Sequence, residues 1–97
     1  MRKRRMQRSW SDFIGDILES IAHGERKGYD IACASRINFA NTMFLLRQLV
    51  IMGYVELRVL MGKRDEYFLT EKGMELLKHF NVIKLLTQKI YMEVLKK

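Results

Sequence analysis

The sequence has no proline, only one cysteine and two histidines, and no long uninterrupted apolar run. Cys33 has no partner for an internal disulfide, and one thiol with two scattered histidines does not give the usual ligand spacing of a zinc site. The richest apolar run, residues 43–50, is broken by Arg47 and Gln48, so no segment is long enough to span a membrane. These absences favour a reducing, intracellular setting and predict neither a metal nor a cofactor.

Catalytic motifs are missing as well. The sequence has no glycine-rich phosphate loop, no HExxH or CxxC motif and no serine in a nucleophile-elbow context. Asp12 and Asp16 lie one helical turn apart, but on a surface helix such a pair more often serves solvation and dipole compensation. We expect Cys33 to be a small buried apolar residue. The sequence therefore predicts a protein that is not an enzyme and binds no small-molecule ligand.

The net charge of +7 is concentrated at the N-terminus, because the remainder of the chain is close to neutral. The basic residues of this N-terminal arm (residues 1–9) are Arg2, Lys3, Arg4, Arg5 and Arg8. A basic arm on a nearly neutral domain predicts an anionic partner, with nucleic acid favoured over a merely solubilising terminus. The arm resembles the head of a signal peptide, but Asp12 and Asp16 interrupt the expected apolar region, which favours a cytoplasmic protein.

Apolar periodicity predicts three helices in the first half of the chain. The first spans Ser11–His23, with Ser11 as its N-cap, and the second spans Tyr29–Ser35. The inward residues of the second helix are expected to be Ile31, Ala32, Cys33 and Ala34. The third helix, Phe39–Met52, follows an Asn38 cap and buries one stripe, formed by Thr42, Leu45, Leu46, Leu49 and Val50. The short turn before it gives helix-turn-helix spacing.

After the third helix the apolar period changes to that of strands. Residues 54–60 and 66–69 are rich in β-forming side chains, and a turn over residues 62–65 joins them. The result is a hairpin with a basic tip at Lys63 and Arg64. Three helices followed by a hairpin predict a winged helix-turn-helix domain over residues 10–70, in the mainly α, α+β class.

The last predicted helix, residues 71–97, follows a Thr70 cap and is about 40 Å long. Gly73 at its third position leaves no capping box and instead permits close approach of neighbouring backbone. An apolar seam with four- and three-residue spacing runs along the helix and comprises Leu76, Phe80, Ile83, Thr87, Ile90 and Val94. Because the seam extends beyond one domain, we expect dimerisation through this helix rather than folding back over its own domain.

Four segments, ILESIAHG, ASRINF, LVIMGYV and YFLTEKGMELL, occur in this order before the long terminal helix. In this combination the chain, from about Phe13 to its end, resembles the archaeal ten-kilodalton winged-helix chromatin proteins, the Sso ten-a family. The resemblance implies a dimer joined by an antiparallel coiled coil, with a winged helix that binds double-stranded DNA at each end. It also implies a weakly specific, nucleoid-associated DNA organiser or a transcription regulator.

The resemblance places Asn38 at the start of the recognition helix, with Asn41 and Arg47 on or near its exposed face. Met43 and Phe44 stand where relatives commonly have lysines. They allow apolar contact with thymine methyls, docking of a protein, or shielding within the dimer, and we favour the last two. The candidate DNA contacts are Arg2, Lys3, Arg4, Arg5, Arg8, Lys27, Arg36, Asn38, Asn41, Arg47, Lys63 and Arg64.

The expected function is thus binding of double-stranded DNA by a homodimer, mainly through phosphate contacts of the winged helix and the arm. The alternative is a protein-interaction module that docks a partner on Met43, Phe44 and Ile51 of the third helix.

Overall fold

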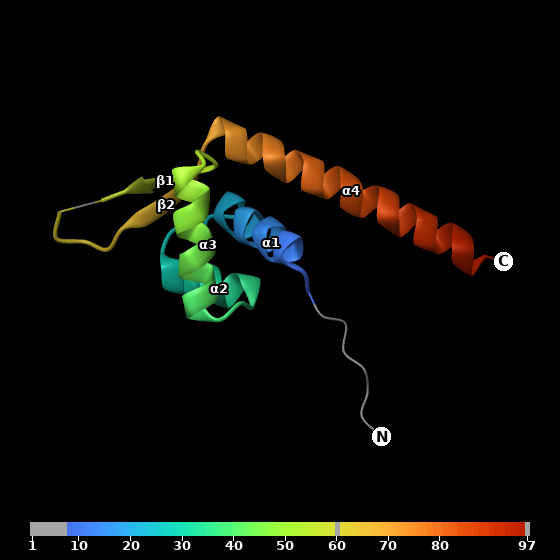
Figure 1. Ribbon diagram of the computed structural model, residues 1–97, viewed down its shortest axis with the longest axis horizontal. Helices are drawn as coiled ribbons and strands as arrows, with labels where there is room; N and C mark the ends of the chain where they lie inside the picture. The colour runs from blue at the N-terminus through green and yellow to red at the C-terminus, as the bar shows by residue number, and fades with distance from the viewer. Residues whose placement is uncertain (1–7, 60, 97) are drawn as a thin grey trace, which may run out of the picture.

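The computed structural model describes residues 8–59 and 61–96; Arg2, Lys3, Arg4 and Arg5 of the predicted arm lie outside this part. The elements are α1 Trp10–Ala22, α2 Gly28–Ser35, α3 Phe39–Ile51, β1 Val55–Arg58, β2 Glu66–Leu69 and α4 Glu71–Leu95. Helices α1, α2 and α3 form a compact group, the hairpin projects from one side, and α4 runs away from the other (Figure 1). This order and arrangement confirm the predicted winged-helix fold.

Helix α1 begins at Trp10, one residue earlier than predicted, because its N-cap is Ser9 and not Ser11. The Ser9 hydroxyl accepts a hydrogen bond from the Asp12 backbone N–H, and the Asp12 carboxylate accepts one from the Ser9 backbone N–H. This reciprocal pair is a capping box, which requires an acceptor side chain three residues after the cap. Ser11 has Ile14 at that position and could not form one.

Helix α2 buries fewer of its small residues than predicted. Ile31, Ala32 and Ser35 face the core, whereas Cys33 and Ala34 are exposed. At 100° per residue, positions 31, 32 and 35 share one side of the helix, and positions 33 and 34 point away from it. The prediction that Cys33 and Ala34 lie inward was therefore wrong.

Helix α3 follows a tight turn in which Arg36 has a positive φ of 60°. The Asn38 side chain accepts a hydrogen bond from the Asn41 backbone N–H at 2.8 Å, which confirms Asn38 as the N-cap. The predicted inward stripe is confirmed: Thr42, Leu45, Leu46 and Leu49 are buried and Val50 is partly buried. Helix α3 is therefore anchored along one face and exposes the opposite one.

The hairpin is antiparallel and pairs Val55 with Leu69 and Arg58 with Glu66. Strand β1 is shorter than the predicted strand over residues 54–60, because only Val55 at its inner end reaches the core and Val59 is exposed. Residue 60 lies outside the described part. The outer half of the hairpin is therefore a true wing, standing away from the body (Figure 1).

The wing is tied to the body at its base. The Tyr67 backbone N–H donates to the Arg26 carbonyl at 2.8 Å, and the Tyr67 side chain is buried. The Arg26 and Arg58 guanidinium groups lie 4.5 and 3.8 Å from the centre of the Phe68 ring, a geometry that favours cation–π attraction. The residues at the base therefore hold β2 in place while the tip stays free.

Helix α4 starts at the Thr70 cap, as predicted, and is packed tightly at its first turn. The Thr70 hydroxyl accepts from the Gly73 backbone N–H and lies 2.6 Å from the Gly53 carbonyl, to which it donates. A Cβ atom at Gly73 would overlap the carbonyl oxygen of Tyr54, so glycine permits the close backbone approach that the sequence predicted. The start of α4 is thereby fixed against the loop before β1.

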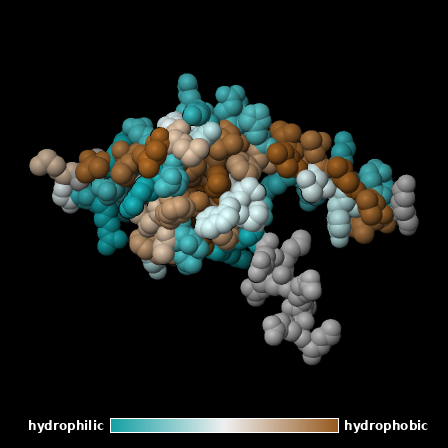
Figure 2. Space-filling view, viewed as in Figure 1, coloured by the Kyte–Doolittle hydropathy of each residue, from teal (hydrophilic) through white to brown (hydrophobic). Residues whose placement is uncertain are grey.

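The hydrophobic core lies between the helices and the base of the wing. Its fully buried large side chains are Ile17, Leu18, Ile21, Ile31, Leu46 and Val55. Leu76, Leu77 and Phe80 of α4 pack against this core, but residues 81–96 are exposed throughout. Figure 2 shows apolar side chains, in brown, along this projecting part of α4. In the described part of the chain, no helix has the length and apolarity needed to cross a membrane.

Candidate nucleic-acid interface

The exposed face of α3, which would be the recognition helix, is largely apolar. Ala40, Phe44, Arg47 and Ile51 follow one another at helical spacing on the side opposite the buried stripe. Phe44 is 55 % exposed and Ile51 is 70 % exposed. Arg47 is the only charged residue of this face, so the face has little intrinsic affinity for phosphate.

Trp10 at the start of α1 extends this apolar surface. Its ring lies edge-on to Phe44, with centroids 6.4 Å apart, and edge-on to Phe13 at 5.6 Å. We call the exposed side chains Trp10, Phe44 and Ile51 the apolar patch. Trp10 was not among the predicted site residues, because Trp10 and Phe44 are 34 positions apart in the sequence and no local pattern links them.

The two asparagines predicted to contact DNA are placed differently. Asn38 uses its side-chain oxygen to cap α3, so that oxygen is already hydrogen-bonded. Asn41 lies one turn into the helix and is partly buried. On α3 itself, Arg47 has the position best suited to reach a ligand in front of the helix.

Three basic side chains meet beside the wing. Lys27 at the start of α2 and Lys63 and Arg64 from the wing tip line one open hollow, together with Gly62. We call Lys27, Lys63 and Arg64 the wing cluster. The Lys27 ammonium also lies 3.7 Å from the Glu66 carboxylate, so part of its charge is offset. The wing cluster therefore brings Lys27 close to Lys63, which is 36 positions away in the sequence.

A smaller hollow of about 170 Å³ connects the wing cluster to the start of α3, since Lys27, Arg64, Phe39 and Met43 all line it. Tyr67 also lines this hollow. Burial raises the pKa of the Tyr67 phenol, Asp65 raises it further, and Arg47 opposes both. Tyr67 is therefore neutral at physiological pH and acts as a packing residue between the wing and α3.

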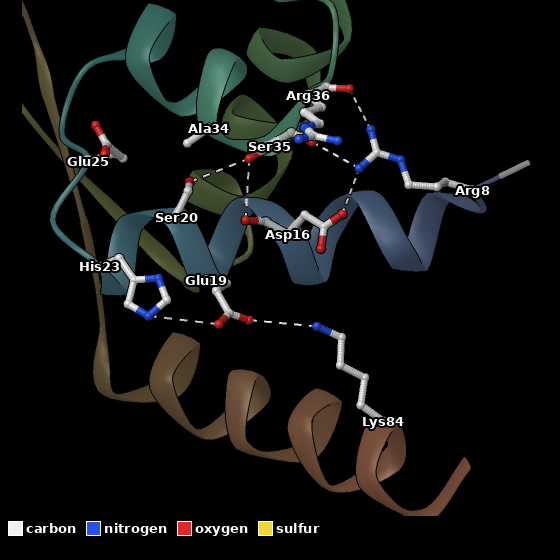
Figure 3. A pocket seen from close by; sticks show the side chains of 10 residues that line it. All are labelled: Arg8, Asp16, Glu19, Ser20, His23, Glu25, Ala34, Ser35, Arg36 and Lys84. Atoms are coloured by element: carbon white, nitrogen blue, oxygen red, sulfur yellow. Dashed lines mark hydrogen bonds and ion pairs between the residues drawn. The ribbon is translucent and has the colours of Figure 1, made fainter. Parts of the chain in front are cut away.

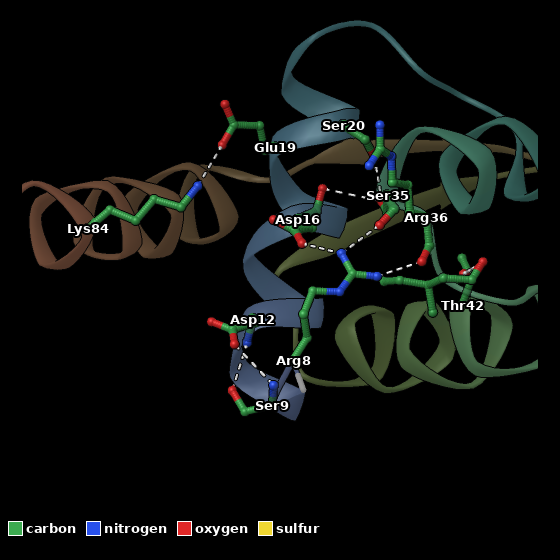
Figure 4. A network of polar contacts seen from close by, with 11 residues as sticks. Arg8, Ser9, Asp12, Asp16, Glu19, Ser20, Ser35, Arg36, Thr42 and Lys84 are labelled. Carbon is green, nitrogen blue, oxygen red and sulfur yellow. Dashed lines mark hydrogen bonds and ion pairs between the residues drawn. The ribbon is translucent and has the colours of Figure 1, made fainter. Parts of the chain in front are cut away.

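Arg8 holds the start of α1 against the end of α2 (Figure 4). Its guanidinium donates to the Asp16 carboxylate at 2.8 Å, to the Ser35 carbonyl at 2.9 Å and to the Arg36 carbonyl. It also lies 4.9 Å from the centre of the Phe13 ring. The Arg8 guanidinium thus makes its contacts within the domain, and its predicted role as a DNA contact of the arm stays a prediction.

Glu19 links α1 to α4. Its carboxylate lies 3.8 Å from the Lys84 ammonium and 3.9 Å from a ring nitrogen of His23 (Figure 3). The adjacent hollow of about 400 Å³ is lined by Arg8, Arg36 and Lys84 but also by Asp16, Glu19 and Glu25. It therefore has no clear preference for an anion or a cation. Within residues 8–59 and 61–96, no three His, Cys, Asp or Glu side chains form a metal-binding group.

The predicted seam of α4 divides into two parts. Leu76 and Phe80 are partly buried because they pack against the core of their own domain. Beyond them, Ile83 and Ile90 are 60 and 64 % exposed, and Thr87 and Val94 are exposed as well. An exposed apolar stripe therefore begins at Ile83, just beyond the two seam residues that pack against the core.

Comparison with known proteins identifies the fold. Sso10a-2, a DNA-binding protein from Sulfolobus solfataricus, is similar at 24 % identity over 92 % of both chains, with a TM-score of 0.77. The MarR family regulator SP03579 is 15 % identical over 84 % of this chain and 56 % of its own, with a TM-score of 0.74. Staphylococcus aureus MepR in complex with DNA is 20 % identical over 91 % of this chain and 65 % of its own, with a TM-score of 0.65.

No curated protein matches the chain. The profile of the winged helix-turn-helix family, however, matches residues 7–88, which is most of the sequence. With three helices, a two-stranded wing and the helix-turn-helix spacing in place, the protein belongs to the winged helix-turn-helix family.

Proposed function

We propose that the protein is a cytoplasmic, dimeric double-stranded DNA-binding protein, acting as a nucleoid-associated organiser or a transcription regulator. The observation that carries the proposal is the wing cluster. Lys27, Lys63 and Arg64 surround one hollow next to the start of α3, where the fold brings the wing and the recognition helix together. Both Sso10a-2, named a DNA-binding protein, and the MepR–DNA complex share this fold.

Affinity in this proposal comes mainly from phosphate neutralisation and release of counterions. The wing cluster contacts one stretch of backbone, and Arg2, Lys3, Arg4 and Arg5 of the arm follow another or enter a minor groove. Arg36 in the turn between α2 and α3 and Arg47 on the exposed face of α3 add further contacts. Arg8 and Asn38 contribute indirectly, because their side chains hold α1 and α3 in position.

Sequence readout is expected to be weak. The face of α3 that would enter the major groove offers Arg47 and Asn41 but otherwise presents Phe44 and Ile51. Apolar side chains contact thymine methyls but make no hydrogen bonds to base edges. The protein therefore binds many sequences with similar affinity, as suits a DNA organiser.

The dimer forms through the exposed half of α4, residues 81–96, in an antiparallel coiled coil. In the proposed division, residues 1–9 are the arm, 10–70 the DNA-binding domain and 71–97 the dimerisation helix. An antiparallel pair of such helices separates two DNA-binding domains, which allows one dimer to contact two sites on a duplex or two duplexes.

Fluorescence anisotropy with two unrelated duplexes of equal length tests the proposal. At low salt we expect binding to both, with dissociation constants within about tenfold of each other, since phosphate contacts carry no sequence information. If the protein binds neither duplex, the proposed DNA binding is refuted. Binding to one duplex only would refute the non-specific mechanism.

The apolar patch supports a second candidate, a protein-interaction module. Trp10, Phe44 and Ile51 expose aromatic and aliphatic area on the face where DNA-binding relatives are expected to carry charge. The double variant F44A/I51A separates the two candidates. It leaves DNA affinity unchanged within about twofold if phosphate contacts dominate, whereas a docking surface would lose its partner.

A further inference from the structure

The stripe of α4 that packs on α1 is the same stripe that is left exposed farther along. Leu76 and Phe80 occupy the first two positions of the seam, and a Cβ atom at Gly15 of α1 would lie 3.2 Å from the Phe80 ring. The next seam position, Ile83, is already exposed. Any helix that covers the remaining seam therefore lies on the same side of α4 as α1 and meets α1 at this point.

A groove exists at this junction. A hollow of about 220 Å³ lies between α1 and α4, with an apolar floor that includes Leu77, Phe80 and Ile83. Asp12 and Asp16 of α1 form its acidic edge. Lys84 also lines the groove, but it pairs with Glu19, and Arg8 offsets part of the Asp16 charge. The groove is thus apolar inside and mildly acidic at the rim.

The seam gives the register of its partner. In an antiparallel pair, seam residues alternate across the interface, and we take the symmetric register that pairs the four exposed positions with one another. It sets Ile83 against the partner's Val94 and Thr87 against the partner's Ile90. The last turn of the partner's helix, including the partner's Lys96, then lies beside Phe80 and the groove.

We infer that the groove between α1 and α4 receives the C-terminal end of a second copy's α4, an inference that rests on the proposed dimer. The partner's Val94 covers Ile83, the last turn covers the apolar floor, and the partner's Lys96 reaches the acidic edge formed by Asp12 and Asp16. The charges are complementary, and the exposed seam continues directly into the groove.

This contact gives the dimer a defined shape. A coiled coil that touched only α4 would leave each winged helix oriented by one helix alone. A partner helix end seated against α1 instead ties each DNA-binding domain to both copies of α4. The spacing and relative orientation of the two wing clusters are then fixed by the fold rather than by a flexible joint.

Thiol cross-linking tests the inference in the full-length chain with Cys33→Ser, because Cys33 is exposed. The pair I83C/V94C reports the register of the coiled coil by disulfide formation. The pair S11C/K96C, treated with a short bis-maleimide, reports the groove. We expect both double variants to give covalent dimers and all four single variants to stay monomeric on denaturing gels.

The outcomes separate the inference from the proposed function. If I83C/V94C is linked but S11C/K96C is not, the groove is unoccupied and the inference fails while the dimer stands. If neither is linked, the antiparallel dimer itself fails. A covalent dimer formed by the single variant V94C would indicate another register and would also overturn the inference.

A charge test needs no cross-linker. Lys96→Glu should raise the dissociation constant of the dimer about fivefold, since the two symmetry-related ion pairs together contribute about 1 kcal/mol at partly covered sites. The matched variant Lys89→Glu, one heptad earlier on the same face of the helix and away from the groove, should change it less than twofold. Adding S11K to K96E should restore dimerisation. Equal effects of K96E and K89E would contradict the groove contact.

Discussion

The packed body of the molecule and the projecting half of α4 contain similar residues in opposite surroundings. Ile17, Leu46 and Val55 of the body are fully buried, whereas residues 81–96 carry isoleucine, leucine and valine exposed to solvent. The body packs a core within one chain and leaves the apolar patch exposed on its surface. The projecting half of α4 buries none of its apolar side chains in the described part of the chain, and we propose that a second copy covers them.

The largest effect is expected from substitutions that disrupt the proposed dimer interface on the projecting half of α4. The double variant I90E/V94E places charges in the proposed interface. At each of the four substituted sites in the dimer it removes about 1.5 kcal/mol or more of hydrophobic stabilisation. The dissociation constant of the dimer should rise more than a thousandfold, as measured by sedimentation velocity. Gln88→Glu, exposed on the same helix, is the control. A variant that stays dimeric at micromolar concentration would contradict the coiled coil.

A matched pair of leucines measures the difference between the two regions. Leu46 is 0 % exposed and Leu85 is 67 % exposed. Leu46→Ala should lower the free energy of unfolding by about 2–5 kcal/mol through lost burial and a cavity. Leu85→Ala should change it by less than about 0.5 kcal/mol. Urea denaturation followed by circular dichroism gives both values, and similar losses would mean that the Leu85 side chain is buried in solution.

Substitutions in the wing cluster and in α4 compare how much each region contributes to DNA affinity. The double variant K63A/R64A should weaken binding to every duplex alike, by about tenfold at moderate salt, and lower the salt slope by about two. The control K78A/K89A removes two positive charges from exposed positions of α4 instead. Anisotropy titrations compare the two. Equal losses would mean that net charge, not the wing cluster, governs affinity.

The smallest expected effect concerns Arg8 and Arg36, which lie side by side but act differently. Arg8→Ala removes three hydrogen bonds within the body and should cost about 1 kcal/mol of stability, a value reduced by its partial exposure. Arg36→Ala should leave stability nearly unchanged and reduce DNA affinity slightly. Thermal unfolding and anisotropy on both variants distinguish them, and a reversal of the two patterns would contradict these roles.

Periodicity predicted most of the fold, because long apolar repeats mark which face of a helix is buried. The stripe from Thr42 to Val50 was predicted correctly on this basis, and the Thr70 cap was predicted correctly from the preference of threonine for the N-cap position. Helix α2 has only eight residues, and its alanine and cysteine side chains are small. The apolar pattern was therefore too weak to show that Cys33 and Ala34 lie on the exposed face. The cap at Ser9 was readable from the spacing of Ser9 and Asp12 but was assigned to the neighbouring Ser11.

The candidate site was harder to predict, since its parts come from distant positions. Nothing in the local sequence indicates that Arg8 reaches the carbonyls of Ser35 and Arg36, or that Trp10 lies against Phe44. The seam was visible as a pattern, but only the structure separates Leu76 and Phe80, which contact their own core, from the exposed remainder. A stripe indicates that apolar surface needs cover and does not say which surface provides it.

The salt dependence of duplex binding by the intact protein tests the central claim most directly. We predict measurable affinity at low salt and a linear decrease of the logarithm of the association constant with the logarithm of the salt concentration. The slope should be about −0.9 for each phosphate neutralised, and several phosphates should contribute. This slope should be the same for duplexes of different sequence. Binding that is absent at low salt, or that is unaffected by salt, would contradict DNA recognition through the wing and the arm.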